Sequence, residues 1–246
     1  MRKPSLAFYS SSIFFIAWEV FARYLNLKFV LPWPTAVLKR MWELRVPLFK
    51  YHMFATLKIA GVSIILSFAL GIFLAVIMDR SKKVEEAIYP IIVTTQTIPT
   101  PAIAPIFILW FGYSIWSKVL VAVLIAFFPV TINLHDGLKS TKKDYIELFK
   151  SMHAREWDIF WKLKVPSTIP YFFSSLKMAI PLVLIGAAIG EWLGATAGLG
   201  YFSKRMMTQL DGAGVFAPIV LISIIAVSFV NLISYLEKKF LKWRGN

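Results

Sequence analysis

The sequence predicts an all-α membrane protein with six transmembrane helices, and three observations support this. Apolar residues make up 58% of the 246-residue chain and charged residues 16%, whereas soluble domains are about 45–50% apolar. Uncharged runs of bilayer-spanning length recur between short polar stretches. The 27 Lys and Arg outnumber the 13 Asp and Glu, and basic loops held in the cytoplasm explain this excess better than a nucleic-acid partner does.

The first predicted span covers residues 6–25 and follows the basic pair Arg2 and Lys3. Because no small-residue cleavage site follows it and further apolar segments do, we expect an uncleaved helix rather than a signal peptide. Glu19 and Arg23 lie inside this span four residues apart, so they can pair on one helix face. The pair is either an anchor at the membrane interface or part of a substrate site.

A loop and the second span follow. Residues 31–56 contain three prolines and several basic residues, and we expect an outer loop there with an amphipathic helix over residues 36–45. Residues 59–78 are uncharged and, at about 1.5 Å per residue, match the hydrocarbon thickness as a second span. Residues 79–86 then form a short basic turn in the cytoplasm.

The third predicted span, residues 87–110, is interrupted by prolines. No charge occurs from residue 87 to residue 117, which is too long for one straight helix across a bilayer. Backbone groups freed at a break are tolerated at membrane depth only where protein or a water-filled cavity satisfies them. The candidates for lining a translocation path are therefore Gln96, Thr97, Pro99 and Thr100. Alternatively, these residues only pack helices around a kink. Residues 112–114 are expected to form the outer turn.

Three more spans are predicted, over residues 117–134, 170–192 and 214–236. The fourth span returns the chain to the cytoplasm at His135 and Asp136, and we expect an irregular outer loop with one short helix before the sixth. The fifth span is rich in small residues, which favour close packing against another span or subunit. It also carries Glu191 near its outer end. A carboxylate there is costly unless it faces a cavity or a partner, so Glu191 is a candidate for the path; alternatively it reaches water at the interface.

Residues 144–170 form a basic amphipathic segment between two apolar blocks. Its first apolar residues recur at the spacing of one helix face: Tyr145, Leu148, Phe149 and Met152. A second apolar cluster follows across His153 and Ala154, which predicts two short helices joined by a bend. Proline lacks an amide donor, so we expect Pro166 and Pro170 to end the segment. A pair of such helices can dock into a groove on another protein.

Several enzyme classes are disfavoured by the sequence. It contains no G-x-x-x-x-G-K phosphate loop, so the chain is not expected to hydrolyse ATP itself. No cysteine is present, and the three histidines lie on separate segments, which argues against a metal site. No G-x-S-x-G elbow accompanies the serines. We therefore expect no ATPase site and no cofactor in this chain.

Residues 144–170 also resemble the coupling motif of permeases from binding-protein-dependent ABC importers, E-A-A-x-x-x-G followed further on by a proline. Glu147 matches the glutamate, Ala154 follows the glycine position, and Pro166 and Pro170 match the terminal prolines. Three stretches are similar to the nitrate, sulfonate, taurine and thiamine-precursor group of these permeases: IYPIIVTTQTIPTPAIAPIFILWFG, FFPVTINLHDGLKS and GEWLGATAGLGYF.

This resemblance implies a single transmembrane domain with the type I ABC importer permease architecture, in a bacterial inner membrane. It also implies a second permease copy, a dimer of ATPase subunits that binds ATP and Mg, and an extracytoplasmic solute-binding protein. The cargo would be a sulfonate- or nitrate-like anion or a pyrimidine precursor of thiamine. The distribution of Lys and Arg among the predicted loops places both termini in the cytoplasm. Residues carried over as coupling residues are Glu147, Phe149, His153, Ala154, Phe160 and Pro166.

The chain departs from the motif at the bend. Leu148 and Phe149 replace the two alanines, and His153 replaces the glycine. Histidine is among the non-glycine residues found at positive φ, so the bend is expected to survive while docking or partner choice differs. Two other functions remain open: an ion-coupled secondary transporter, which usually needs several ionisable groups in the membrane, and a membrane assembly protein without a transport path.

Overall fold

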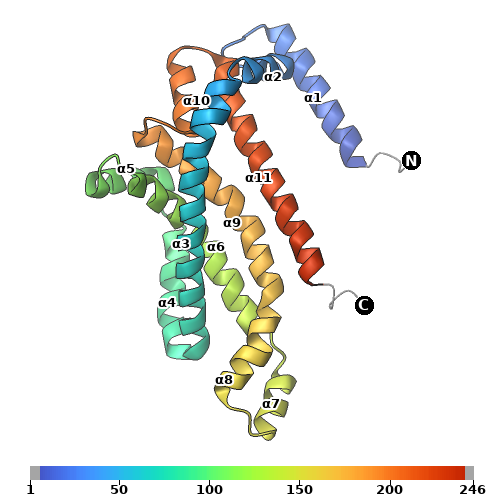
Figure 1. Ribbon diagram of the computed structural model, residues 1–246, viewed down its shortest axis with the longest axis vertical. Coiled ribbons are helices and arrows are strands. Elements are labelled where there is room, and N and C mark those ends of the chain that lie inside the picture. The colour runs from blue at the N-terminus through green and yellow to red at the C-terminus, as the bar shows by residue number, and fades with distance from the viewer. Residues whose placement is uncertain (1–5, 242–246) are drawn as a thin grey trace.

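The computed structural model describes residues 6–241, and this part of the chain is entirely helical apart from its connections. Long helices run side by side along the molecule, with α7 and α8 at one end and α2 and α10 at the other (Figure 1). The long helices are α3 (Met53–Arg80), α6 (Ile115–Lys139), α9 (Val165–Gly194) and α11 (Gly212–Phe240). The end helices are α2 (Pro34–Glu43), α7 (Lys143–Ser151), α8 (Glu156–Ile159) and α10 (Leu199–Thr208).

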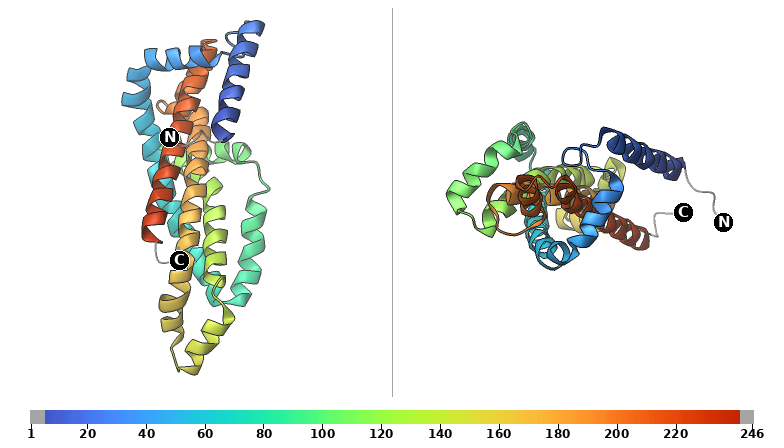
Figure 2. Two further views of the ribbon diagram at one scale, coloured as in Figure 1. Left: turned by 90° about the vertical axis from the view of Figure 1, so that its right-hand side faces the viewer. Right: turned by 90° about the horizontal axis from the view of Figure 1, so that it is seen from above.

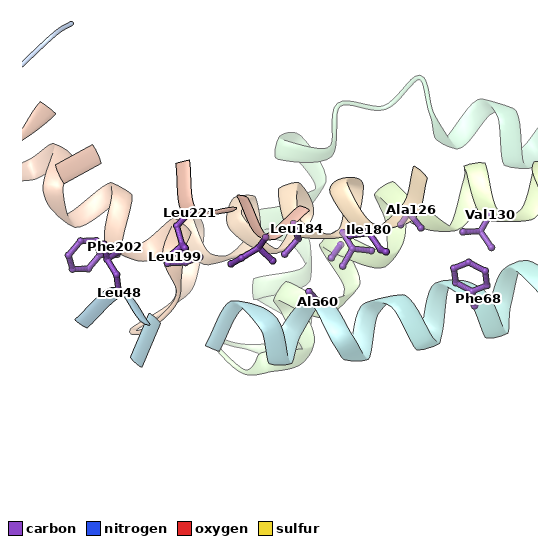
Figure 3. Close-up of a cluster of buried hydrophobic side chains, with 14 of the residues drawn as sticks. Leu48, Ala60, Phe68, Ala126, Val130, Ile180, Leu184, Leu199, Phe202 and Leu221 are labelled. Atoms are coloured by element: carbon purple, nitrogen blue, oxygen red, sulfur yellow. The ribbon is translucent and has the colours of Figure 1, made fainter. Parts of the chain in front are cut away.

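The centre of the bundle is the contact between α6 and α9, which α3 covers on one side. Glycines let these two backbones approach closely. A Cβ on Gly186 would lie 2.5 Å from the Ala122 Cα, and one on Gly190 would lie 2.9 Å from the Lys118 Cα. Larger apolar side chains fill the rest of the core (Figure 3). The small residues predicted in the fifth span thus pack against another span, as expected.

Four helices are long and apolar enough to cross a membrane: Val46–Arg80, Ile115–Lys139, Glu156–Gly194 and Gly212–Phe240. A fifth crossing is possible if α4 (Lys82–Thr95) and α5 (Thr100–Phe111) are one broken span, since they pass the same test together but are bent by 98°. Helix α1 (Leu6–Leu25) has the bounds of the first predicted span. It does not pass that test on its own, so its place in the membrane is a prediction.

Helix α1 stands apart from the bundle and is attached near its last turns (Figures 1 and 2). The predicted pair between Glu19 and Arg23 is confirmed, with 2.6 Å between Arg23 Nε and Glu19 Oε1. The Thr35 hydroxyl also donates to Glu19 Oε1, at 2.7 Å, and this ties α1 to α2. Residues 2, 3, 242 and 244, whose charges entered the prediction for the termini, lie outside the described residues.

The outer loop predicted over residues 31–56 is wrong for its second half. Residues Val46–His52 form a π-helical segment that continues directly into α3. Pro47 lies in the first turn of this segment. The missing amide of proline costs nothing there, because the first amides of a helix have no acceptor within the helix. Only α2 corresponds to the amphipathic helix that the sequence predicted.

Helix α6 extends beyond the predicted fourth span, through His135 and Asp136, to Lys139. One predicted helix end is wrong. Helix α9 contains both Pro166 and Pro170, which were expected to end the segment before it. A π-helical turn over Phe160–Lys164 precedes Pro166, and its wider backbone spacing accommodates the proline ring. One continuous helix therefore extends from Glu156 to Gly194.

Candidate functional site

The bend between α7 and α8 lies where the sequence predicted it, and its geometry is that of a Schellman helix end. His153 has φ of 56°. Its amide donates to the Lys150 carbonyl at 3.0 Å, and the Ala154 amide donates to the Phe149 carbonyl at 3.0 Å. The position after the helix end is usually glycine because positive φ brings an L side chain against its own backbone. Histidine occupies this position here, and the bend is preserved.

The apolar face of α7 is uncovered. Tyr145, Leu148 and Met152 are 51%, 54% and 70% exposed, Phe149 is half-buried, and Glu147 is exposed beside them. Helix α7 projects beyond the end of the bundle (Figure 1). An apolar helix face with charged neighbours and no cover within its own chain has the character of a docking surface.

Polar and aromatic contacts fix the first turns of the long helix to the bundle. Lys164 Nζ donates to both carboxylate oxygens of Asp79, at 2.8 and 2.9 Å, and so joins α9 to the end of α3. The Arg80 guanidinium lies 5.7 Å from the ring centroid of Phe160. Pro166 is the second residue of α9. A groove of 430 Å³ opens beside these residues, between α3, α6 and α9. These contacts tie the start of the long helix to α3.

The break in the third predicted span falls between Thr95 and Thr100, as the sequence predicted. Pro99 caps the start of α5, and the Thr97 hydroxyl donates to the Thr94 carbonyl at 2.8 Å. Gln96, Thr97 and Pro99 are exposed. Figure 1 shows α5 lying across the bundle between its two ends. The polar residues of this break are therefore not covered by the rest of the chain.

Glu191 lies elsewhere, at the opposite end of α9 from α8, and its side chain is 0% exposed. It does not reach water, so the interfacial alternative is wrong in this conformation. Its Oε1 accepts a hydrogen bond from the Thr56 hydroxyl of α3 at 2.8 Å. Its Oε2 accepts one from the backbone amide of Gly200 in α10 at 2.7 Å. A carboxylate predicted as a path candidate is thus enclosed between three helices.

The neighbours of Glu191 are themselves tightly placed. Gly198 has φ of 126°, and a Cβ on it would lie 2.2 Å from the Glu191 carboxyl carbon, so no other residue fits there without displacement. Lys118 is also buried. Its Nζ donates to the carbonyls of Tyr113 and Ser114, at 2.7 and 2.9 Å, which secures the turn before α6.

An ion pair holds α2 at the same end of the molecule as Glu191. Arg40 Nε donates to Asp211 Oδ2 at 2.8 Å, and Asp211 Oδ1 accepts from the Gly214 amide at 2.9 Å, which caps α11. The carboxylates of Glu43 and Asp211 raise the pKa of the Arg40 guanidinium above its ordinary value. Among the residues that the structure describes, no three His, Asp or Glu side chains are grouped to hold a metal ion.

Residues 67–242 match the family described as the binding-protein-dependent transport system inner membrane component. The chain belongs to this family. The matched region includes α4, α5 and the exposed helix pair α7 and α8. The match confirms the predicted relationship to ABC importer permeases. The chain is a multi-pass permease of an ABC importer, and an ion-coupled transporter or a non-transporting assembly protein is set aside.

Named relatives agree with this assignment. The chain is 51% identical over 229 residues to the formylaminopyrimidine transport permease protein ThiX of Halalkalibacterium halodurans, covering 93% of this chain and 92% of the relative. It is 28% identical to the putative aliphatic sulfonates transport permease protein SsuC of Bacillus subtilis, covering 88% and 79%. A chain of the inward-facing MetNI methionine ABC transporter has the same fold, with a TM-score of 0.67 at 17% identity, covering 83% of this chain and 97% of that chain.

Sequence reasoning did not identify the partners of Lys164, just before α9, and of Glu191, near its far end. Lys164 and Asp79 are 85 residues apart in the chain, and Thr56 and Glu191 are 135 apart. No local pattern pairs such residues, because their contact depends on how α3 and α9 are aligned. The position of Glu191 among small residues was the only signal.

Proposed function

We propose that two copies of this permease form the membrane pathway of an importer in the bacterial inner membrane, driven by two ATPase subunits. The observation that carries this proposal is the uncovered apolar face of α7 beside Glu147 and the bend at His153. The coupling residues are those predicted from the sequence: Glu147, Phe149, His153, Ala154, Phe160 and Pro166. ATP and Mg belong to the ATPase partner. A solute-binding protein docks on the opposite, extracytoplasmic end.

In the membrane, α1 and the broken pair α4 and α5 complete six crossings, and both termini lie in the cytoplasm. The end of the bundle that carries α7 also carries a cluster of basic residues: Arg80, Lys82, Lys83, Lys139 and Lys142. Such a bias favours the cytoplasmic side. The start of α1 and the end of α11 both lie between the level of α2 and the level of α7 (Figure 1). This supports a common side for both termini.

The translocation path runs past the break at Gln96, Thr97, Pro99 and Thr100. This break is exposed in a single chain, and backbone that ends a helix at membrane depth needs protein or water to satisfy it. A pathway between two copies provides both. Glu191 does not touch the solute. It supports the path indirectly, because it holds the outer end of the bundle together.

The solute that we propose is a pyrimidine precursor of thiamine of the formylaminopyrimidine type. The 51% identity to ThiX extends over nearly the whole chain, whereas the sulfonate permease is 28% identical and the nitrate permease NrtB of Synechococcus elongatus 25%. Sulfonate and nitrate therefore serve as comparison solutes.

The test is uptake by the reconstituted complex. Permease, ATPase and binding protein are purified together, placed in proteoliposomes, and supplied with labelled formylaminopyrimidine, taurine or nitrate with and without ATP. Uptake of the pyrimidine that requires ATP and the binding protein is the expected result. Uptake that continues without ATP, or that favours taurine or nitrate, contradicts the proposal.

A further inference from the structure

The start of α10 is held at the outer end of the bundle through three consecutive backbone amides. The Gly198 amide donates to His52 Nδ1 at 3.1 Å, the Leu199 amide to the Thr56 hydroxyl oxygen at 2.8 Å, and the Gly200 amide to Glu191 Oε2 at 2.7 Å. The first amides of a helix have no acceptor within it and are usually satisfied by a residue just before the helix. Here, the acceptors come from α9, α3 and the π-helical segment before α3.

Thr56 links two of these contacts. Its hydroxyl donates to Glu191 Oε1 at 2.8 Å while its oxygen accepts from Leu199. Thr56, Glu191, Gly198 and Leu199 are buried, so water does not substitute for a lost partner and each bond is costly to break. Removal of the Thr56 hydroxyl alone would therefore break two hydrogen bonds, one that joins α3 to Glu191 of α9 and one that joins α3 to Leu199 of α10.

The start of α10 has no room for a side chain at positions 198 and 200. A Cβ at position 198 would overlap the Glu191 carboxylate, and one at position 200 would lie 2.3 Å from the Ala188 carbonyl oxygen of α9. The two glycines thus bring α10 into backbone contact with α9. Because the site is filled by the chain's own carboxylate, it is a structural joint and not a place for a ligand.

We propose that Glu191, Thr56 and His52 form an outer latch that makes α10 and the outer ends of α3 and α9 one rigid unit throughout the transport cycle. The same α9 helix extends without interruption to α8, and Lys164 joins its inner end to Asp79 of α3. Movement of α8 is then carried to α10 at the far end. The proposal rests on the proposed function, in which α7 and α8 receive the movement of the ATPase. Glu191 and Thr56 are positioning residues in it.

The first test measures distance in the assembled importer. The chain contains no cysteine, so Lys58→Cys in α3 and Thr208→Cys in α10, two exposed sites, are its only positions for spin labels. The labelled chain is assembled with an unlabelled second copy and cysteine-free partner subunits, so that each complex carries one pair of labels. The distance is measured in nanodiscs without nucleotide and with ATP trapped on a hydrolysis-deficient ATPase. One narrow distance that is the same in both states is expected. A distance that changes between the states overturns the rigid latch.

The second test removes the hydrogen bonds of the Thr56 hydroxyl from the latch without changing the shape of the side chain. Thr56→Val should broaden the distance between the same labels and lower the solute imported per ATP by about tenfold, which corresponds to about 1.4 kcal/mol of coupling. Thr56→Ser should restore both quantities. Thr131→Val is the matched control, because Thr131 is equally buried but its hydroxyl bonds only within α6, to the Phe127 carbonyl at 2.7 Å.

The outcomes separate the two proposals. If Thr56→Val keeps the wild-type distance and the wild-type ratio of solute to ATP, the latch is refuted while ATP-driven uptake by the wild type still supports the proposed function. If the wild-type complex imports nothing with ATP, the proposed function fails and the distances still decide whether the unit is rigid. Should Thr56→Val fail to assemble, the wild-type distances alone decide.

Discussion

The bend at His153 yields a prediction whose size follows from backbone geometry. Replacing His153, which has φ of 56°, by glycine removes the contact between an L side chain and its backbone, a cost of about 1–2 kcal/mol. Glycine also gains freedom when the bend opens, which offsets about 0.5–1 kcal/mol. His153→Gly should therefore stabilise the closed bend by about 0.5–1 kcal/mol, which is about two- to fivefold in its opening equilibrium.

Hydrogen exchange at the bend measures this equilibrium. The amides to follow are those of residues 153 and 154, which are bonded to the Lys150 and Phe149 carbonyls. Exchange should be slowest with glycine, faster with asparagine, faster again with the native histidine, and fastest with valine. Valine comes last because β-branched residues disfavour positive φ most. Ser151→Gly is the control: Ser151 is within α7, where glycine should speed exchange.

The result that would refute this reasoning is equal or faster exchange in His153→Gly than in the wild type, or unchanged exchange with valine. Uptake provides a second measurement. His153→Gly should keep full ATP-driven uptake, because it supplies the residue that such a bend prefers. Loss of uptake with a stabilised bend would show that the imidazole itself contacts the ATPase.

Three further predictions concern single residues. Glu147→Lys should reduce uptake per ATP while the protein still inserts, and wild-type transport would contradict a coupling role. Asp79→Ala leaves Lys164 without its carboxylate in a mostly buried place and should lower the free energy of unfolding by about 2 kcal/mol, whereas Asp79→Asn should cost less; equal stability of all three in denaturant titrations would count against this pair. Gly200→Ala should cost about 1–3 kcal/mol by overlap with the α9 backbone, whereas Gly61→Ala, which has open space, should be neutral or stabilising in the same titrations.

Features set by neighbouring residues could be predicted from the sequence. The Glu19 and Arg23 pair follows from the turn of one helix, and it forms as expected. The break near Pro99 follows from residues that disfavour continued helix, and the bend at His153 follows from the two apolar clusters that it separates. Both lie where the sequence placed them.

The errors over residues 46–52 and 165–170 came from prolines that a helix tolerates. Pro47 and Pro166 each lie in or beside a π-helical turn that precedes a long span. The missing amide is harmless for Pro47, in the first turn of its segment, and the preceding π-helical turn accommodates Pro166. The sequence around a proline does not reveal either case, because each depends on packing against the bundle, where Leu48 and Ile159 are both buried.

The role proposed for α9 raises the question of why a helix with internal prolines moves as one piece. Pro170 and Pro181 each remove a hydrogen bond from its backbone, so the helix alone would bend at these points. Its stiffness must come from α6, which packs along it from Lys118 beside Gly190 to Gly137, where a Cβ would lie 2.8 Å from the Thr168 Cγ2. These close contacts bracket both prolines. The proposal therefore assigns the movement between the two ends to the α6 and α9 pair, whose close contact depends on small residues such as Gly186 and Gly190.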